Sequence, residues 1–319
     1  MKRTAFTRAR LVAASAIALV VWQFGTGTTS RAQQAPSPPA PPQAPAPSPP
    51  PLMTLMAGPL TLNPNPFQFD IGGFGPIYGT GVLTGLGLTQ TNSLPGDRAS
   101  QFDISNGVAI VQKIDGLLQF YAQAGIYTLP VALGAPYLRA STATSDLFGP
   151  LPEGFLKLAP TDSFSLQGGK LWTLYGAEYI FTFENINVEH GLLTIQEPAI
   201  SRGVQANYTA GPVALSASFN DGFYSDRFNW LVGSATWTID SRNTMTAIGG
   251  GNLGRSPTAT IVTPLAQNNS DILNLIYTYS NAPWTIIPYF QFTHVPKITG
   301  RGFYAPASTY GGSVLVITP

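Results

Sequence analysis

Of the 319 residues only 10% are charged, against about 25% in an ordinary soluble domain, although 44% are hydrophobic. There is no cysteine, which excludes disulfides, zinc–thiolate sites and cysteine nucleophiles. The formal net charge of +1 supplies no basic footprint for nucleic acid, and no motif for a cofactor occurs, so we expect neither as a partner.

Residues 1–32 are predicted to be a secretory signal peptide. Four basic side chains within the first ten residues precede an apolar stretch at 11–22, and Ser30 and Ala32 are the small residues of a cleavage site after Ala32. The alternative is a membrane-anchor helix, but a spanning helix needs roughly 20 apolar residues and this stretch is shorter. Cleavage removes five of the 16 basic residues, which leaves 11 against 15 acidic ones, a net charge of −4.

A linker is predicted to follow at 33–69, rich in proline and alanine and placed in the periplasm. Residues 36–51 hold ten prolines in 16 positions, a composition that favours a semi-rigid polyproline II segment. A plain spacer is the simplest reading, and a stalk that reaches peptidoglycan or binds a partner is the alternative. The remainder, 70–319, is predicted to be one β-domain.

This domain alternates apolar and polar side chains with a period of two. At 117–129 one face carries Leu118, Phe120, Ala122, Ala124 and Ile126, and the other carries Gln119, Tyr121, Gln123 and Gly125. The stretches 212–220 and 271–280 repeat the pattern. Such alternation is typical of transmembrane strands with one face toward lipid and one toward a polar lumen.

Twelve strands are predicted, joined by connections that alternate between short and long. The predicted strands are 77–90, 101–112, 116–128, 152–159, 163–172, 199–210, 212–221, 227–240, 243–252, 271–280, 284–295 and 308–317. Short periplasmic turns and long external loops produce this rhythm. The fold class is therefore all-β, a transmembrane antiparallel up-and-down β-barrel. A soluble β-sandwich is the alternative, but its surface needs more charge.

The long connection at 173–198 is the candidate functional segment. It carries Glu178, Glu184, Glu189 and Glu197, with Lys170 and Arg202 at the adjacent strand ends. Charged side chains at a narrow point set ion selectivity, so this loop, folded inward, would form a mildly cation-selective constriction. An ordinary external loop is the alternative. The candidate lumen-facing residues are Gln119, Tyr121, Gln123, Gln205, Asn207, Ser216, Ser218 and Asn274.

Two further features of the strands need a structural explanation. Trp230, Trp237 and Trp284 are expected to face lipid or the membrane interfaces. Pro288 lies within a predicted strand, where it favours a bulge or an unpaired position.

Catalysis is not expected, because a hydrolase would need one of the two histidines, His190 or His294, beside a serine and an orienting group.

Four blocks of the chain carry a resemblance to a known family. They are QFDISNGVAIVQKIDGLLQFYAQAGIYTLP (101–130), GGKLWTLYGAEYIFTFENINVEHGLL (168–193), EPAISRGVQANYTAGPVALSASFNDGFYSDRFNWLVGSATW (197–237) and DILNLIYTYSNAPWTIIPYFQFTHVP (271–296). In these blocks the chain resembles the OmpL-like β-barrel porins of proteobacteria. The resemblance implies an outer-membrane barrel of a Gram-negative bacterium through which small solutes diffuse.

The end of the chain departs from that family. Residues 314–319 lack the terminal aromatic with which outer-membrane barrels usually finish, and family members continue for several more strands. We therefore expect the barrel to be truncated at its C-terminal end.

The leading functional hypothesis is a porin-like channel for passive diffusion of small hydrophilic solutes or ions. The alternative is a non-conducting structural or polymer-secretion barrel, and a lipid hydrolase is a third option. The expected partners are outer-membrane lipid, the solutes, the barrel-assembly machinery during biogenesis and a second copy of the chain in a homo-oligomer.

Overall fold

The computed structural model describes residues 66–130, 136–185, 187–297 and 305–318. The predicted signal peptide and almost all of the predicted linker lie outside the described residues. All the described residues belong to one unit, Pro50–Pro319.

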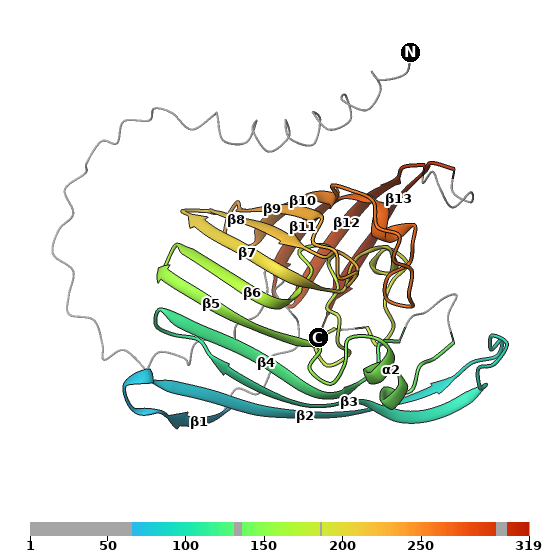
Figure 1. Cartoon of the computed structure of the whole chain (residues 1–319), viewed down its shortest axis with the longest axis horizontal. Coiled ribbons are helices and arrows are strands. Elements are labelled where there is room, and N and C mark those ends of the chain that lie inside the picture. The colour runs from blue at the N-terminus through green and yellow to red at the C-terminus, as the bar shows by residue number, and fades with distance from the viewer. Residues whose placement is uncertain (1–65, 131–135, 186, 298–304, 319) are drawn as a thin grey trace, which may run out of the picture. The chain divides into compact units, whose positions relative to one another are not determined.

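The unit is built on a single antiparallel sheet in which each strand pairs with its neighbours in the sequence (Figure 1). The strands are β1 (Phe67–Asp70), β2 (Pro76–Thr89), β3 (Ser100–Lys113), β4 (Leu118–Tyr127), β5 (Glu153–Thr161), β6 (Phe164–Trp172), β7 (Ile200–Ala210), β8 (Val213–Asn220), β9 (Trp230–Thr238), β10 (Asn243–Asn252), β11 (Asp271–Asn281), β12 (Trp284–Val295) and β13 (Ala307–Ile317). The predicted up-and-down fold class is confirmed, and all twelve predicted strands are present. The short β1 is additional, and within the described residues no pairing joins it to β13.

The connections keep the predicted alternation. Two-residue turns join β5 to β6, β7 to β8 and β11 to β12, whereas the longest connections, 128–152, 173–199 and 253–270, follow β4, β6 and β10. These long connections hold the short helices α2 (Ala140–Asp146), η2 (Thr194–Gln196) and η3 (Gln267–Asn269), and η1 (Gly72–Phe74) lies between β1 and β2. None of the helices in the described part of the chain is long and apolar enough to cross a membrane.

The two faces of the sheet differ in the way the sequence pattern predicts. Along β4, Gln119, Tyr121 and Gln123 are buried on one face, while Leu118 and Ile126 are exposed on the other. β8 and β11 show the same division. The exposed face carries large apolar side chains on most strands, among them Leu83, Phe102, Leu156, Val204, Leu231, Leu273 and Phe292. An apolar surface of this extent suits contact with lipid.

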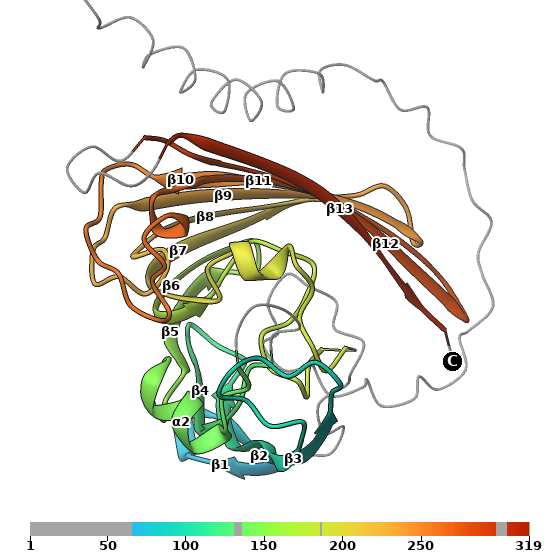
Figure 2. The same cartoon turned by 90° about the vertical axis from the view of Figure 1, so that its right-hand side faces the viewer.

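The opposite face is concave and is covered by the connection at 173–199 (Figure 2). We call its described residues, 173–185 and 187–199, the inner loop. Ile180, Phe181 and Phe183 of this loop pack with Val108 and Ile110 of β3 in one apolar cluster. A second cluster joins its Tyr175 to side chains of β9 to β12: Trp230, Val232, Ile248, Ile272, Ile276 and Tyr289. The concave face is therefore a packed core where the inner loop covers it.

Trp230 corrects the expectation that the strand tryptophans face lipid. Its side chain is fully buried on the concave side, and its indole N–H donates to the carbonyl of Asn268 at 3.2 Å. Trp237 on the same strand is 46% exposed. Trp237 follows Trp230 by seven residues, an odd number, so the two side chains point to opposite faces of the strand.

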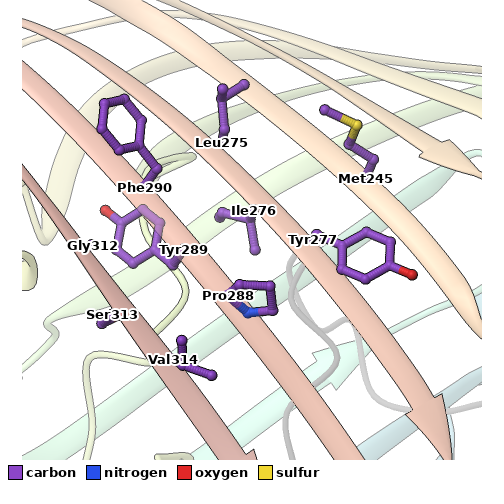
Figure 3. A pocket seen from close by; sticks show the side chains of 10 residues that line it. All are labelled: Met245, Leu275, Ile276, Tyr277, Pro288, Tyr289, Phe290, Gly312, Ser313 and Val314. Atoms are coloured by element: carbon purple, nitrogen blue, oxygen red, sulfur yellow. The ribbon is translucent and has the colours of Figure 1, made fainter.

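Pro288 occupies a gap in the ladder between β11 and β12. Pairing runs as far as Ile276 with Tyr289 and resumes at Tyr279 with Ile286, so the register is kept and no bulge forms. A proline has no N–H to donate, which accounts for an interruption at this point. A hollow opens in the wall beside it, lined by β10 to β13 (Figure 3).

Gly222, in the connection from β8 to β9, provides a test of the packing around Trp230. Its φ is +60°, and an added Cβ would lie 2.2 Å from the Trp230 Nε1 atom. Gly211, in the turn between β7 and β8, has a φ of +56° and open space around it.

We expect Gly211→Ala to cost roughly 1–2 kcal/mol of unfolding free energy through left-handed strain alone. Gly222→Ala should lose about 1–3 kcal/mol more, because it also overpacks the core. Urea unfolding of both variants in detergent micelles measures the difference. Equal losses would show that Trp230 does not restrict residue 222.

Candidate functional site: the inner loop and the concave wall

The predicted lumen-facing residues lie on the concave face of β4, β7, β8 and β11. The Tyr121 hydroxyl donates to Gln123 Oε1 at 3.0 Å, and Gln119 Nε2 donates to the Gly116 carbonyl at 3.1 Å. On the next part of the wall Gln205 Nε2 and the Ser216 hydroxyl donate to Asn207 Oδ1 at 2.7 and 2.8 Å. These bonds arrange the polar side chains into networks on the wall.

The inner loop is attached to the first half of the sheet through side chains. Asn106 of β3 donates through Nδ2 to the Thr182 hydroxyl at 2.5 Å. The buried His190 has Nδ1 2.9 Å from the carbonyl oxygen of Pro130 and Nε2 2.9 Å from that of Tyr179.

A second set of contacts attaches the other end of the inner loop to β11, β12 and β13. The Tyr289 hydroxyl and Asn274 Nδ2 both donate to Glu197 Oε1. Gln291 Nε2 donates to the carbonyl of Leu193 at 3.1 Å. The hydroxyls of Thr293 and Thr309 lie 3.2 and 2.8 Å from Gln196 Oε1. The loop therefore connects strands that are far apart in the sheet.

The carboxyl groups of the inner loop have four different surroundings. Glu189 is exposed, and Glu178 is partly buried and accepts from the Gly191 N–H and the Thr194 hydroxyl at 2.9 and 2.6 Å. Glu184 and Glu197 are buried. Glu178, Glu184 and Glu189 therefore differ in exposure and in hydrogen-bond partners.

Burial raises the pKa of Glu184 to about 8, and the backbone N–H of Phe181 offsets this only in part. Burial also raises the pKa of Glu197 to about 8, opposed by the hydrogen bonds from Tyr289 and Asn274 and increased by the nearby Glu178. Both groups are thus largely uncharged at neutral pH.

Glu153, at the start of β5, was not predicted as a site residue. It is fully buried, it interacts electrostatically with Glu184 and Tyr121, and the Trp172 indole is placed to donate to its carboxyl group. Glu153 lies two residues before Phe155, so both side chains point to the same, inner face of β5. Phe155 packs on the first apolar cluster. That parity, together with a carboxylate in a strand, is the sequence signal that could have identified it.

Lys170 and Arg202 lie opposite each other on β6 and β7. Lys170 Nζ donates to the carbonyls of Phe148 and Leu151 at 2.9 and 2.7 Å. Arg202 forms ion pairs with Asp221 and Asp226 at 2.8 and 2.7 Å, and its guanidinium lies 3.8 Å from the ring centre of Tyr224. Both cations therefore brace the long connections beside them, and the charge of Arg202 is balanced by carboxylates.

The second histidine lies on the exposed face. His294 Nδ1 is 2.9 Å from the Ser308 hydroxyl, and within the described residues no ion pair links His294 to a carboxylate. A serine nucleophile needs a base that is itself oriented by a third group. The described residues also contain no cluster of three or more acidic or histidine side chains that could hold a metal ion.

The comparison with protein families agrees with this architecture. Residues 76–317 match the family model described as "Putative beta-barrel porin-2, OmpL-like". No curated protein matches the chain. Among solved structures, a loop L8 deletion mutant of OmpT, an outer membrane protein of Vibrio cholerae, is similar at 12% identity over 75% of this chain and 86% of that one, with a TM-score of 0.34. Since the family model spans β2 to β13, the chain belongs to the OmpL-like β-barrel porin family.

Proposed function

We propose that this porin-like outer-membrane barrel is a channel for passive diffusion of small hydrophilic solutes or ions. The observation that carries the proposal is the inner loop, which lies across the concave wall and is attached to both halves of the sheet. Such a loop narrows the passage beside it. Solutes would be sorted there by size and charge, without turnover.

The remaining assignments belong to the same proposal. The basic and apolar N-terminal segment would direct export, the apolar outer face would contact outer-membrane lipid, and the barrel-assembly machinery would insert the strands. A homo-oligomer is the expected state of such a channel. The match to a porin family supports transport rather than catalysis.

A non-conducting structural or polymer-secretion barrel is the second candidate, and one observation favours it. The inner loop covers its part of the wall with aromatic side chains, including Tyr175, Phe181 and Phe183, in two apolar clusters. A passage filled in this way would conduct poorly. Electrical recording separates the two candidates, because only the channel gives discrete current steps.

We expect the purified full chain to give single-channel steps in planar bilayers. Replacing residues 174–196 by a short Gly/Ser linker should increase the step size, since the segment that narrows the passage is removed. The matched control shortens the exposed connection at 91–98, which should leave the step size unchanged. An absence of steps in every preparation would reject the channel in favour of the structural barrel.

We also expect a preference for cations that depends on the accessible acids of the inner loop. The double variant Glu178→Gln/Glu189→Gln should move the reversal potential in a KCl gradient toward anions, because negative charge near the narrow point is lost. Asp162→Asn, in the exposed turn between β5 and β6, is the control for the same type of change elsewhere. An unchanged reversal potential in the double variant would remove these glutamates from the constriction.

A further inference from the structure

We propose that the hollow beside Pro288 is a binding site for one acyl chain of a membrane phospholipid, on the lipid-facing side of the wall. The inference goes beyond the proposed channel, because it needs the membrane location of the barrel and not conduction. It depends on the shape of the outer face at one place, where β10 to β13 together form the hollow (Figure 3).

The hollow has an apolar rim on the outer face of the sheet. The rim consists of exposed side chains from all four strands: Met245, Leu275, Tyr277, Phe290 and Val314. The Tyr277 hydroxyl donates to Asn243 Oδ1, so the polar end of that side chain already has a partner. The rim therefore presents hydrocarbon to its surroundings, as the rest of the outer face does.

Two residues with little side-chain reach give the hollow its depth. Gly312 lies opposite Phe290, and Pro288 lies opposite Val314, in the pairing of β12 with β13. Gly312 has no side chain to extend into the hollow, and the proline ring stays close to its own backbone. The larger side chains around these two positions form the rim.

The floor of the hollow belongs to the packed core of the concave side. Ile276 and Tyr289 line it, are buried, and pack in the second apolar cluster with Tyr175 of the inner loop. Because they are packed on the inner side, these side chains are not available to fill the hollow from outside. Pro288 brings no N–H to this surface, so a hydrocarbon chain lying on it covers no donor of that residue.

The position of the hollow along the strands indicates the depth at which it lies. Met245 is the third residue of β10 and Pro288 is the fifth of β12, so both lie near the strand ends that short turns join. Four residues span roughly 14 Å of strand, or roughly 10 Å of depth at the tilt of a barrel wall, within an apolar band roughly 25 Å tall. The hollow is therefore at the depth of acyl chains, in the half of the wall nearer the short turns.

This depth and side favour a phospholipid as the occupant. The short turns of an outer-membrane barrel lie on the periplasmic side, where the leaflet consists of phospholipid. Water is absent at this depth, and an empty hollow would forfeit the contacts of its lining. Lipid tails are as apolar as the rim, so the stabilisation comes from close packing of the chain and not from the hydrophobic effect.

Photo-crosslinking in liposomes measures occupancy of the hollow in the full chain. The probe is phosphatidylethanolamine with a diazirine in the middle of one acyl chain, and the adducts are mapped by mass spectrometry of peptides. We expect the adducts to concentrate on 275–277, 288–290 and 312–314 relative to the outer faces of the other strands. Adducts spread evenly around the wall would overturn the proposal.

Gly312→Leu should abolish the concentrated adducts, because the new side chain fills the hollow. An added Cβ would lie 3.4 Å from the Tyr289 carbonyl oxygen, which is an ordinary contact. Val314→Trp, at an exposed position of the rim, is a second blocking variant should Gly312→Leu fold poorly. Concentrated adducts that persist in both variants would show that the hollow is not the binding site.

Gly81→Leu is the matched control for the same substitution at the same depth. Gly81 is the sixth residue of β2, and Gly312 is the sixth from the end of β13. Gly81 is exposed, and an added Cβ would lie 3.9 Å from its nearest neighbouring atom. This variant should keep the adduct pattern of the unmodified chain. Loss of the pattern here as well would contradict a site confined to the hollow.

Two other occupants are distinct outcomes of the test. If phospholipid adducts do not concentrate at the hollow, and Gly312→Leu converts an oligomer into a monomer in analytical ultracentrifugation, a second copy of the chain fills the hollow and the phospholipid site is wrong. If only a lipopolysaccharide probe gives concentrated adducts, the phospholipid site is also wrong. Neither result changes the current steps by which the channel is judged.

Discussion

Backbone hydrogen bonding in a lipid environment is the constraint from which this architecture follows. A strand in the bilayer has no water to satisfy its N–H and C=O groups, so each must find a partner on an adjacent strand. Consecutive antiparallel pairing from β1 to β13 provides such partners between neighbouring strands. Pro288 shows the rule at the residue level, since the ladder to β11 is interrupted where the donor is missing.

A wall that alternates lipid-facing and lumen-facing side chains would ordinarily be polar on its inner side. Val108 and Ile110 of β3 are instead apolar residues on the inner side of the wall. Ile180 and Phe181 of the inner loop pack in the same buried cluster. Full burial of such side chains stabilises by roughly 1.5–3 kcal/mol each. The inner loop is therefore part of the folded core as well as the candidate constriction, and its position is held by packing over a large part of the wall.

Environment rather than residue type distinguishes the acidic groups of this site. Glu189 is solvated, Glu178 is bonded within the loop, Glu197 receives donors from the wall, and Glu184 is buried with the backbone N–H of Phe181 as its donor. A solvated carboxylate contributes to the field of a pore, whereas a buried and unpartnered one resists ionisation.

Local information in the sequence determined the strands, their turns and the parity of their side chains. Alternation along β4 predicted which of Gln119 and Leu118 faces inward, because the period of two is a property of the strand itself. The short connection at Gly211 could be predicted from the sequence in the same way, since the residues that form a turn are adjacent in the chain. The family could be recognised from these same local blocks.

Tertiary structure alone decided what the long connections contact. The packing of Phe181 against β3, the burial of Trp230 and the hydrogen bonds from β11 and β12 to Glu197 join segments distant in the chain. No periodic pattern in the sequence encodes such contacts. They depend on how the curved sheet and the long connections bring side chains from distant segments to one place. Burial then sets the charge state of each carboxyl, a property that the residue type by itself does not determine.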